Sequence, residues 1–133
     1  MTMTGRIFAV LALAALPVAG TAQESGTQLY ERHCAYCHGA DATGDGPLAP
    51  ALILQPPDLT RLSERNNGVF PVERVVMRID GREPLVSHGS PMPVFGPFFE
   101  SGRQAAIGTA SGQPILADEP VVTLTEYLRD LQR

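Results

Sequence analysis

Apolar residues recur every three or four positions in three stretches of the chain, and this spacing predicts three amphipathic helices. The first stretch runs from 25 or 26 to 37, the second from 71 to 80, and the third from about 118 to 131. A proline in the first turn of the second and third stretches fits a helix start, and Gly81 fits the end of the second. We expect the last helix to pack on the first, where Gly26 and Tyr30 share one face.

The segments between these helices are rich in glycine and proline, which favours loops. Residues 39–50 contain three glycines and two prolines, and residues 55–59 form a second stiff segment before a short helix to about Asn66. Residues 98–116 show no clear period, so we expect an irregular excursion with a short helix around 103–107. The pattern as a whole predicts an all-α fold of about four to five short helices.

The first 22 residues have the order of features that is typical of a removable export signal. Arg6 precedes an apolar run, Ile7–Ala19, and the small residues Gly20, Thr21 and Ala22 follow it. A membrane anchor is the alternative, but this run is short for a bilayer span of about 20 residues and contains a proline. We therefore expect cleavage of a signal peptide at 1–22, a periplasmic location, and one domain over 23–133 with no membrane span in the mature chain.

The charge pattern narrows the choice of partners. All ten basic residues are arginines, and the formal net charge of −4 becomes −5 when Arg6 is removed with the signal peptide. The two signs of charge are interspersed, so the chain has no basic stripe. We therefore expect neither nucleic acid nor an anionic membrane surface as a partner.

Cys34 and Cys37 are separated by two residues, and His38 follows directly. Two thiols at this spacing can each form a thioether with a haem vinyl group while the adjacent imidazole binds the iron. A thioredoxin-type disulfide is the alternative, but that motif belongs in an alternation of strands and helices that this chain lacks. A zinc site would need two further ligands, and His33 and His88 do not fall in a paired zinc-ligand spacing. The sequence therefore predicts one covalently bound haem c with His38 as an axial ligand.

Met92 is the candidate for the other axial ligand. Pro91 and Pro93 hold it in an extended backbone, which suits a loop that presents one thioether to a metal. The alternatives are His88, Met77 and an iron with an open sixth position.

The second ring nitrogen of His38 needs a hydrogen-bond acceptor that fixes the tautomer of the imidazole. We expect this acceptor to be a backbone carbonyl near Pro47 or Pro50. His33 lies next to Cys34 but points elsewhere on the helix, so we expect it to be a surface or packing residue.

These motifs resemble the class I cytochromes c, the small soluble monohaem electron carriers, here of bacterial type, over nearly all of the mature sequence. In that family a glycine and an aromatic residue lie eight and four positions before the first haem cysteine. They pack against a leucine and a tyrosine of the last helix. The matching residues of this chain are Gly26, Tyr30, Leu124 and Tyr127.

The same resemblance implies the rest of the haem site. The proline that supports the axial histidine in the family is matched better by Pro50, with Leu52 two positions later, than by Pro47. His38 matches the proximal ligand and Met92 the distal ligand. The candidates for contact with the haem propionates are four arginines: Arg61, Arg65, Arg74 and Arg78.

The resemblance implies a periplasmic carrier of one electron, not an enzyme, with transient donor and acceptor proteins as partners. We expect a monomer that binds no small-molecule substrate. The alternatives are a haem subunit of a larger oxidoreductase complex, and a haem enzyme or sensor with an open sixth site. The chain's own core is modest, so we also expect the haem-free protein to be largely unfolded.

Overall fold

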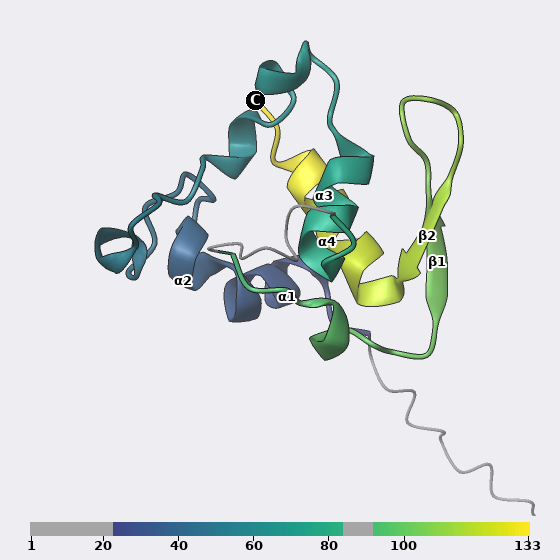
Figure 1. The fold of residues 1–133 in the computed structure, drawn as a ribbon, viewed down its shortest axis with the longest axis horizontal. Coiled ribbons are helices and arrows are strands. Elements are labelled where there is room, and N and C mark those ends of the chain that lie inside the picture. Colours follow the sequence, from purple (N-terminus) through teal and green to yellow (C-terminus); the bar gives the residue numbers. More distant parts are fainter. Residues whose placement is uncertain (1–22, 84–91) are drawn as a thin grey trace, which may run out of the picture.

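The computed structural model describes residues 23–83 and 92–133, which form a helical body with one β-hairpin at its side (Figure 1). The predicted signal peptide at 1–22 lies outside the described residues, as do His88 and Pro91. The α-helices are α1 (Gly26–His33), α2 (Ala35–His38), α3 (Val72–Asp80) and α4 (Glu119–Asp130). Short 3₁₀ helices are η1 (Ala49–Ala51), η2 (Leu59–Arg61), η3 (Glu64–Asn66) and η5 (Gly96–Phe98), and the strands are β1 (Gln104–Ile107) and β2 (Ile115–Asp118).

Helices α1 and α4 pack closely on each other, as the sequence predicts. Gly26 allows this approach, because a Cβ atom at that position would lie only 2.5 Å from the Cβ of Tyr127. One turn further along α1, the rings of Tyr30 and Tyr127 lie with their centroids 5.4 Å apart. Tyr30 and Leu124 are almost completely buried, so the contact between the two helices is the centre of the apolar core.

Helix α3 packs on α4 through an apolar face that is buried along its whole length: Val72, Val75, Val76 and Ile79. Gly81 ends the helix in a left-handed conformation with φ of 86°, which glycine adopts without steric cost. The prediction for this helix and for its end at Gly81 is therefore confirmed, while Pro71 precedes the first turn as the N-cap and does not lie within it. In the described ranges, no helix is long and apolar enough to span a bilayer.

Two predicted helices are more broken than the sequence pattern indicates. The helix predicted over residues 25–37 is interrupted at Cys34, which lies between α1 and α2 and has a φ of −118°. The short helix predicted after residues 55–59, with its end near Asn66, consists of the two separate 3₁₀ turns η2 and η3. Asp58 begins η2 by accepting a hydrogen bond from the backbone N–H of Thr60 at 2.9 Å.

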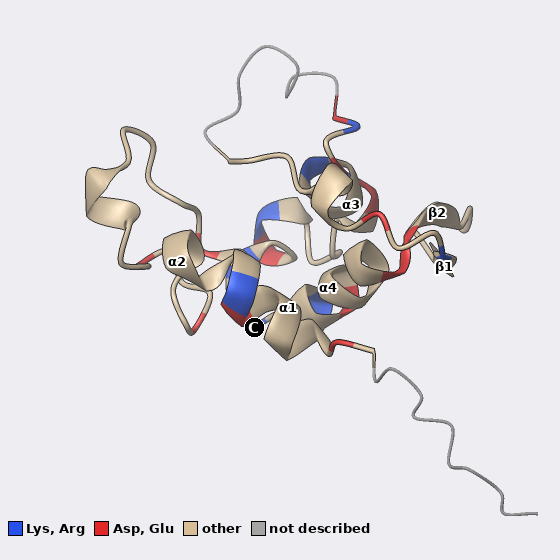
Figure 2. Cartoon of the chain, turned by 90° about the horizontal axis from the view of Figure 1, so that it is seen from below, with Lys and Arg blue, Asp and Glu red and all other residues tan. Residues whose placement is uncertain are grey.

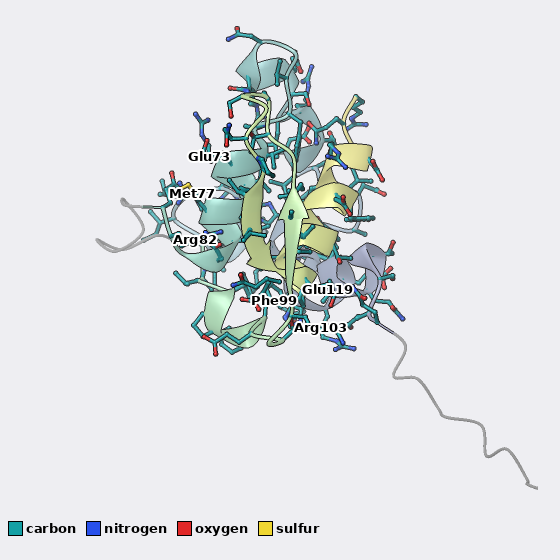
Figure 3. The ribbon with its side chains drawn as sticks, turned by 90° about the vertical axis from the view of Figure 1, so that its right-hand side faces the viewer. Glu73, Met77, Arg82, Phe99, Arg103 and Glu119 are labelled. Atoms are coloured by element: carbon teal, nitrogen blue, oxygen red, sulfur yellow. The ribbon has the colours of Figure 1, made fainter. Side chains whose placement is uncertain are left out.

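The hairpin of β1 and β2 corrects the prediction of a short helix around 103–107. The strands are antiparallel, with Ala105 opposite Ala117 and Ile107 opposite Ile115. Ile107 and Ala117 are buried, and both strands contact α4. Figure 3 looks onto this hairpin, and at its base Arg103 forms an ion pair with Glu119 at 2.5 Å. The fold remains mostly helical, with this one small sheet added.

Candidate cofactor site

Cys34 and Cys37 stand at the junction between α1 and α2, and both are free thiols. Cys34 is buried, whereas Cys37 is partly exposed. Burial, with a smaller contribution from the charge of Cys37, raises the pKa of the Cys34 thiol to about 12. The free Cys34 thiol is therefore protonated and unreactive at neutral pH within the folded chain. Thioether formation is compatible with this burial, because a thioether carries no charge.

His38 ends α2 and is buried, with its Nδ1 atom 3.3 Å from the carbonyl oxygen of Pro57. A carbonyl can only accept, so Nδ1 carries the proton and donates it, which leaves the lone pair of Nε2 for a metal. Burial lowers the pKa of His38 below its ordinary value, and the Pro57 carbonyl partly opposes this effect. The imidazole is therefore neutral at pH 7, as an iron ligand must be.

The acceptor of His38 is a correction to the sequence-based prediction. The sequence predicts a carbonyl near Pro47 or Pro50, whereas the carbonyl that His38 Nδ1 meets is that of Pro57. Pro50 lies in η1 and is exposed. The chain after His38 therefore passes Pro47 and Pro50, and it comes within hydrogen-bonding distance of the imidazole only at Pro57.

Backbone hydrogen bonds hold the start of this loop against α2. The N–H groups of Gly44 and Gly46 donate to the carbonyls of His38 and Cys37 at 2.8 and 3.2 Å. Gly46 must be glycine for this approach, since a Cβ there would lie 2.5 Å from the carbonyl oxygen of Tyr36. The segment that carries both thiols and the imidazole is consequently fixed from two sides.

A buried side chain adds a further constraint on the same segment. The hydroxyl of Tyr30 donates to the carbonyl of Gly39, directly after His38, at 2.7 Å. Burial raises the pKa of the Tyr30 hydroxyl, so it remains a donor at all ordinary pH values. Helix α1 thereby positions the residue that follows the axial ligand.

Met92 is partly buried and packs against the apolar core. Residues 92–99 form the Met92 segment. Within it, the backbone N–H of Phe95 donates to the carbonyl of Ile79 at 2.9 Å, which connects the segment to α3. The ring of His33 packs edge-on against Phe99, with centroids 5.1 Å apart, and also contacts Phe95. His33 is therefore a packing residue, as predicted, and it joins α1 to the Met92 segment.

Met77, an alternative ligand, lies on another face of α3, near Glu73 (Figure 3). It lines an open cleft of about 420 Å³ between α3 and the hairpin tip, residues 109–111. Met92, in contrast, packs against the apolar core. The two methionines therefore lie in different surroundings, one at an open cleft and one against the core.

Three of the arginines considered for propionate contact have partners within the protein. Arg61 pairs with Glu64 and Arg78 with Glu83, each at 2.6 Å. Arg65 donates to the carbonyl of Asp58 at 3.3 Å.

The donor set fits a haem of the c type. Cys34 and Cys37 would form the two thioethers, and Nε2 of His38 would bind the iron. Among the described residues, Met92 is a further soft donor that packs against the apolar core. Pro57, which sequence reasoning missed, holds the imidazole. Its only signal in the sequence is the stiffness of the Pro56–Pro57 pair.

A model of the family described as cytochrome c matches residues 23–132, almost the whole of the chain after the predicted signal peptide. No significant match was found among curated proteins or among solved structures.

Proposed function

The chain belongs to the cytochrome c family, and we propose that it is a periplasmic one-electron carrier with His38 and Met92 as axial ligands. Membership of the family supports a haem-based role in electron transfer. The bound haem supplies the chemistry, because its iron changes between the ferric and ferrous states. The protein's own contribution would be to hold His38 and Met92 as the two ligands of that iron.

The single observation that carries the proposal is the hydrogen bond from His38 Nδ1 to the Pro57 carbonyl at 3.3 Å. It fixes the tautomer and orientation of the imidazole and raises its strength as a ligand. The buried, neutral imidazole then needs no rearrangement when an electron arrives. A ligand held in this way suits electron transfer, in which small geometric change favours fast exchange.

The surface beside the cysteines suits brief encounters with partner proteins. Residues 46–57 carry no charged side chain, and Figure 2 shows the loop around η1 without acidic or basic colour. Tyr36, Leu48, Ile53 and Leu54 are exposed there. A small apolar surface of this kind fits weak, transient association with an electron donor or acceptor.

Two features support Met92 as the second iron ligand: it packs against the apolar core, and a proline lies on either side of it in the sequence. A thioether ligand favours the ferrous state and so raises the reduction potential relative to two histidine ligands. A closed coordination shell also leaves no site for a substrate. The location in the periplasm rests on the export-signal pattern of residues 1–22.

The test is the oxidised absorption spectrum of the haem-loaded protein and of two variants. Met92→Ala should remove the methionine-to-iron charge-transfer band, whereas Met77→Ala, a matched loss of a methionine on α3, should retain it. If the wild type lacks this band and binds carbon monoxide rapidly, the iron has an open sixth position and the protein is a haem enzyme or sensor. Stable co-purification with an oxidoreductase would instead identify it as a haem subunit.

A further inference from the structure

The segment that carries the Pro57 carbonyl is held by Gln132 and Arg133, which follow the end of α4. Directly after Pro57, Asp58 caps η2, and the N–H of Leu59 donates to the carbonyl of Ala42 at 2.8 Å. These local bonds join the segment to the loop after His38. Neither of these bonds connects η2 to α4.

The amide of Gln132 supplies that connection. Its Nε2 donates to the carbonyl of Leu59 at 2.7 Å and to the carbonyl of Leu128 at 2.8 Å. Its Oε1 accepts from the N–H of Ser63 at 2.8 Å. Both protons of the amide are therefore used, and the oxygen is bonded as well, so this side chain has one orientation. It bridges the last turn of α4 to both ends of the segment 59–63.

Arg133 adds a second set of contacts to the same segment. Its backbone N–H donates to the carbonyl of Thr60 at 3.1 Å, and its Nε donates to the Thr60 hydroxyl at 2.9 Å. That hydroxyl in turn donates to Asp58 at 2.5 Å. A continuous series of hydrogen bonds thus leads from Arg133, which follows α4, to Asp58, the residue next to Pro57.

We propose that Gln132 is a positioning residue for the axial ligand: its amide fixes η2 against α4 and so sets the distance from the Pro57 carbonyl to His38 Nδ1. The inference rests on the proposed function, because it concerns how His38 acts toward a bound haem. Gln132 does not touch the imidazole. It acts through the backbone of residues 57–59.

The consequence for the haem has a definite sign. A strong bond from Nδ1–H to a carbonyl makes the imidazole a better electron donor, which stabilises the ferric state. Loosening η2 weakens that bond, so the ferrous state gains relative to the ferric state. Loss of the Gln132 amide should therefore raise the reduction potential.

The experiment compares the full-length haem-loaded protein with Gln132→Ala and Gln132→Met. Methionine keeps most of the side-chain volume but cannot make the three hydrogen bonds. Gln104→Ala, at an exposed glutamine on β1, is the matched control. Two quantities are measured: the reduction potential, and the rate at which the His38 Nδ1 proton exchanges with deuterium, by NMR of the reduced protein.

Both Gln132 variants should show a higher potential and faster exchange of the His38 proton, with Gln104→Ala at the wild-type values. Lower thermal stability with unchanged potential and exchange would overturn the inference, because the role of Gln132 would then be only structural. A wild-type potential for Gln132→Met beside a shifted Gln132→Ala would also overturn it, since packing alone would be responsible. If Gln132→Ala does not accumulate with haem, Gln132→Met alone decides. A wild-type protein without covalent haem would overturn the proposed function itself, and this outcome is visible before any variant is made.

Discussion

Gly26 and Tyr127 lie so close that a Cβ atom at Gly26 would be 2.5 Å from the Cβ of Tyr127 and 3.0 Å from the carbonyl oxygen of Thr123. The crossing of α1 and α4 therefore has no room for a side chain on α1 at this point. Since α1 leads directly into the cysteines, the same crossing sets where the cofactor is attached.

Gly26→Ala should lower the free energy of unfolding by about 1–3 kcal/mol, because the added methyl group forces the two helices apart. Denaturant unfolding of the haem-loaded protein measures this difference. Gly108→Ala is the control, since a Cβ atom there would meet nothing within 4 Å. Equal stability of the two variants would contradict the close crossing.

Tyr30→Phe should destabilise the protein by about 1–3 kcal/mol, because it leaves the buried carbonyl of Gly39 without its donor at 2.7 Å. Tyr36→Phe removes a hydroxyl from an exposed tyrosine and should change stability little. Thermal melts of both haem-loaded variants make the comparison. A wild-type melting temperature for Tyr30→Phe would show that the bond contributes nothing net.

Ile107→Ala should cost about 2–5 kcal/mol, because the Ile107 side chain is buried against the body of the protein. Leu116→Ala, on the neighbouring strand of the same hairpin, is the control, since Leu116 is 57% exposed. Denaturant unfolding should separate the two variants clearly. Similar small effects would mean that the hairpin is an appendage and not part of the core.

The carboxylate of Asp58 should make the stability of the protein depend on pH in the acid range. The side-chain hydrogen bond from Thr60 holds the pKa of Asp58 below its ordinary value of 3.8. The folded state thus binds the proton less readily than the unfolded state does. The stabilisation is present above pH 3.8 and is lost as the pH falls through the lower, folded-state pKa.

Asp58→Asn should therefore lose less stability than the wild type when the pH is lowered into this range, as measured by denaturant unfolding at several pH values. Thr60→Val removes the donor that lowers the pKa, so it should reduce the difference between Asp58 and its asparagine variant. Parallel pH profiles for wild type and Asp58→Asn would refute the assignment.

Replacement of both Cys34 and Cys37 by serine should prevent haem attachment and leave a largely unfolded chain. Haem would tie α2, the loop after it and the Met92 segment to one rigid group, and this binding free energy contributes to folding. Circular dichroism and thermal melting of the purified double variant measure the outcome. A native-like spectrum with a cooperative melt would show that the protein core suffices alone.

The parts of the fold that could be predicted are those in which a residue's role depends on near neighbours in the sequence. The apolar period of residues 72–79 identifies α3, and Gly81 marks its end, because both signals come from a single helix. The pairing of α1 with α4 is predicted by the shared face of Gly26 and Tyr30, and the family resemblance associates the same two residues with the last helix. The hairpin could not be predicted from the sequence, since each strand has only four residues and is stabilised as a strand by contacts with the other strand and with α4.

The sequence by itself determined the cofactor chemistry, because the thioethers and the iron bond need only the local spacing of Cys34, Cys37 and His38. Only the tertiary structure decided how that imidazole is held. Its acceptor, Pro57, lies 19 positions away, and Gln132, which fastens the same segment, lies 73 positions from Leu59. Several prolines could reach a histidine over such a distance, and the structure selects Pro57, next to the segment that Gln132 and Arg133 hold by hydrogen bonds.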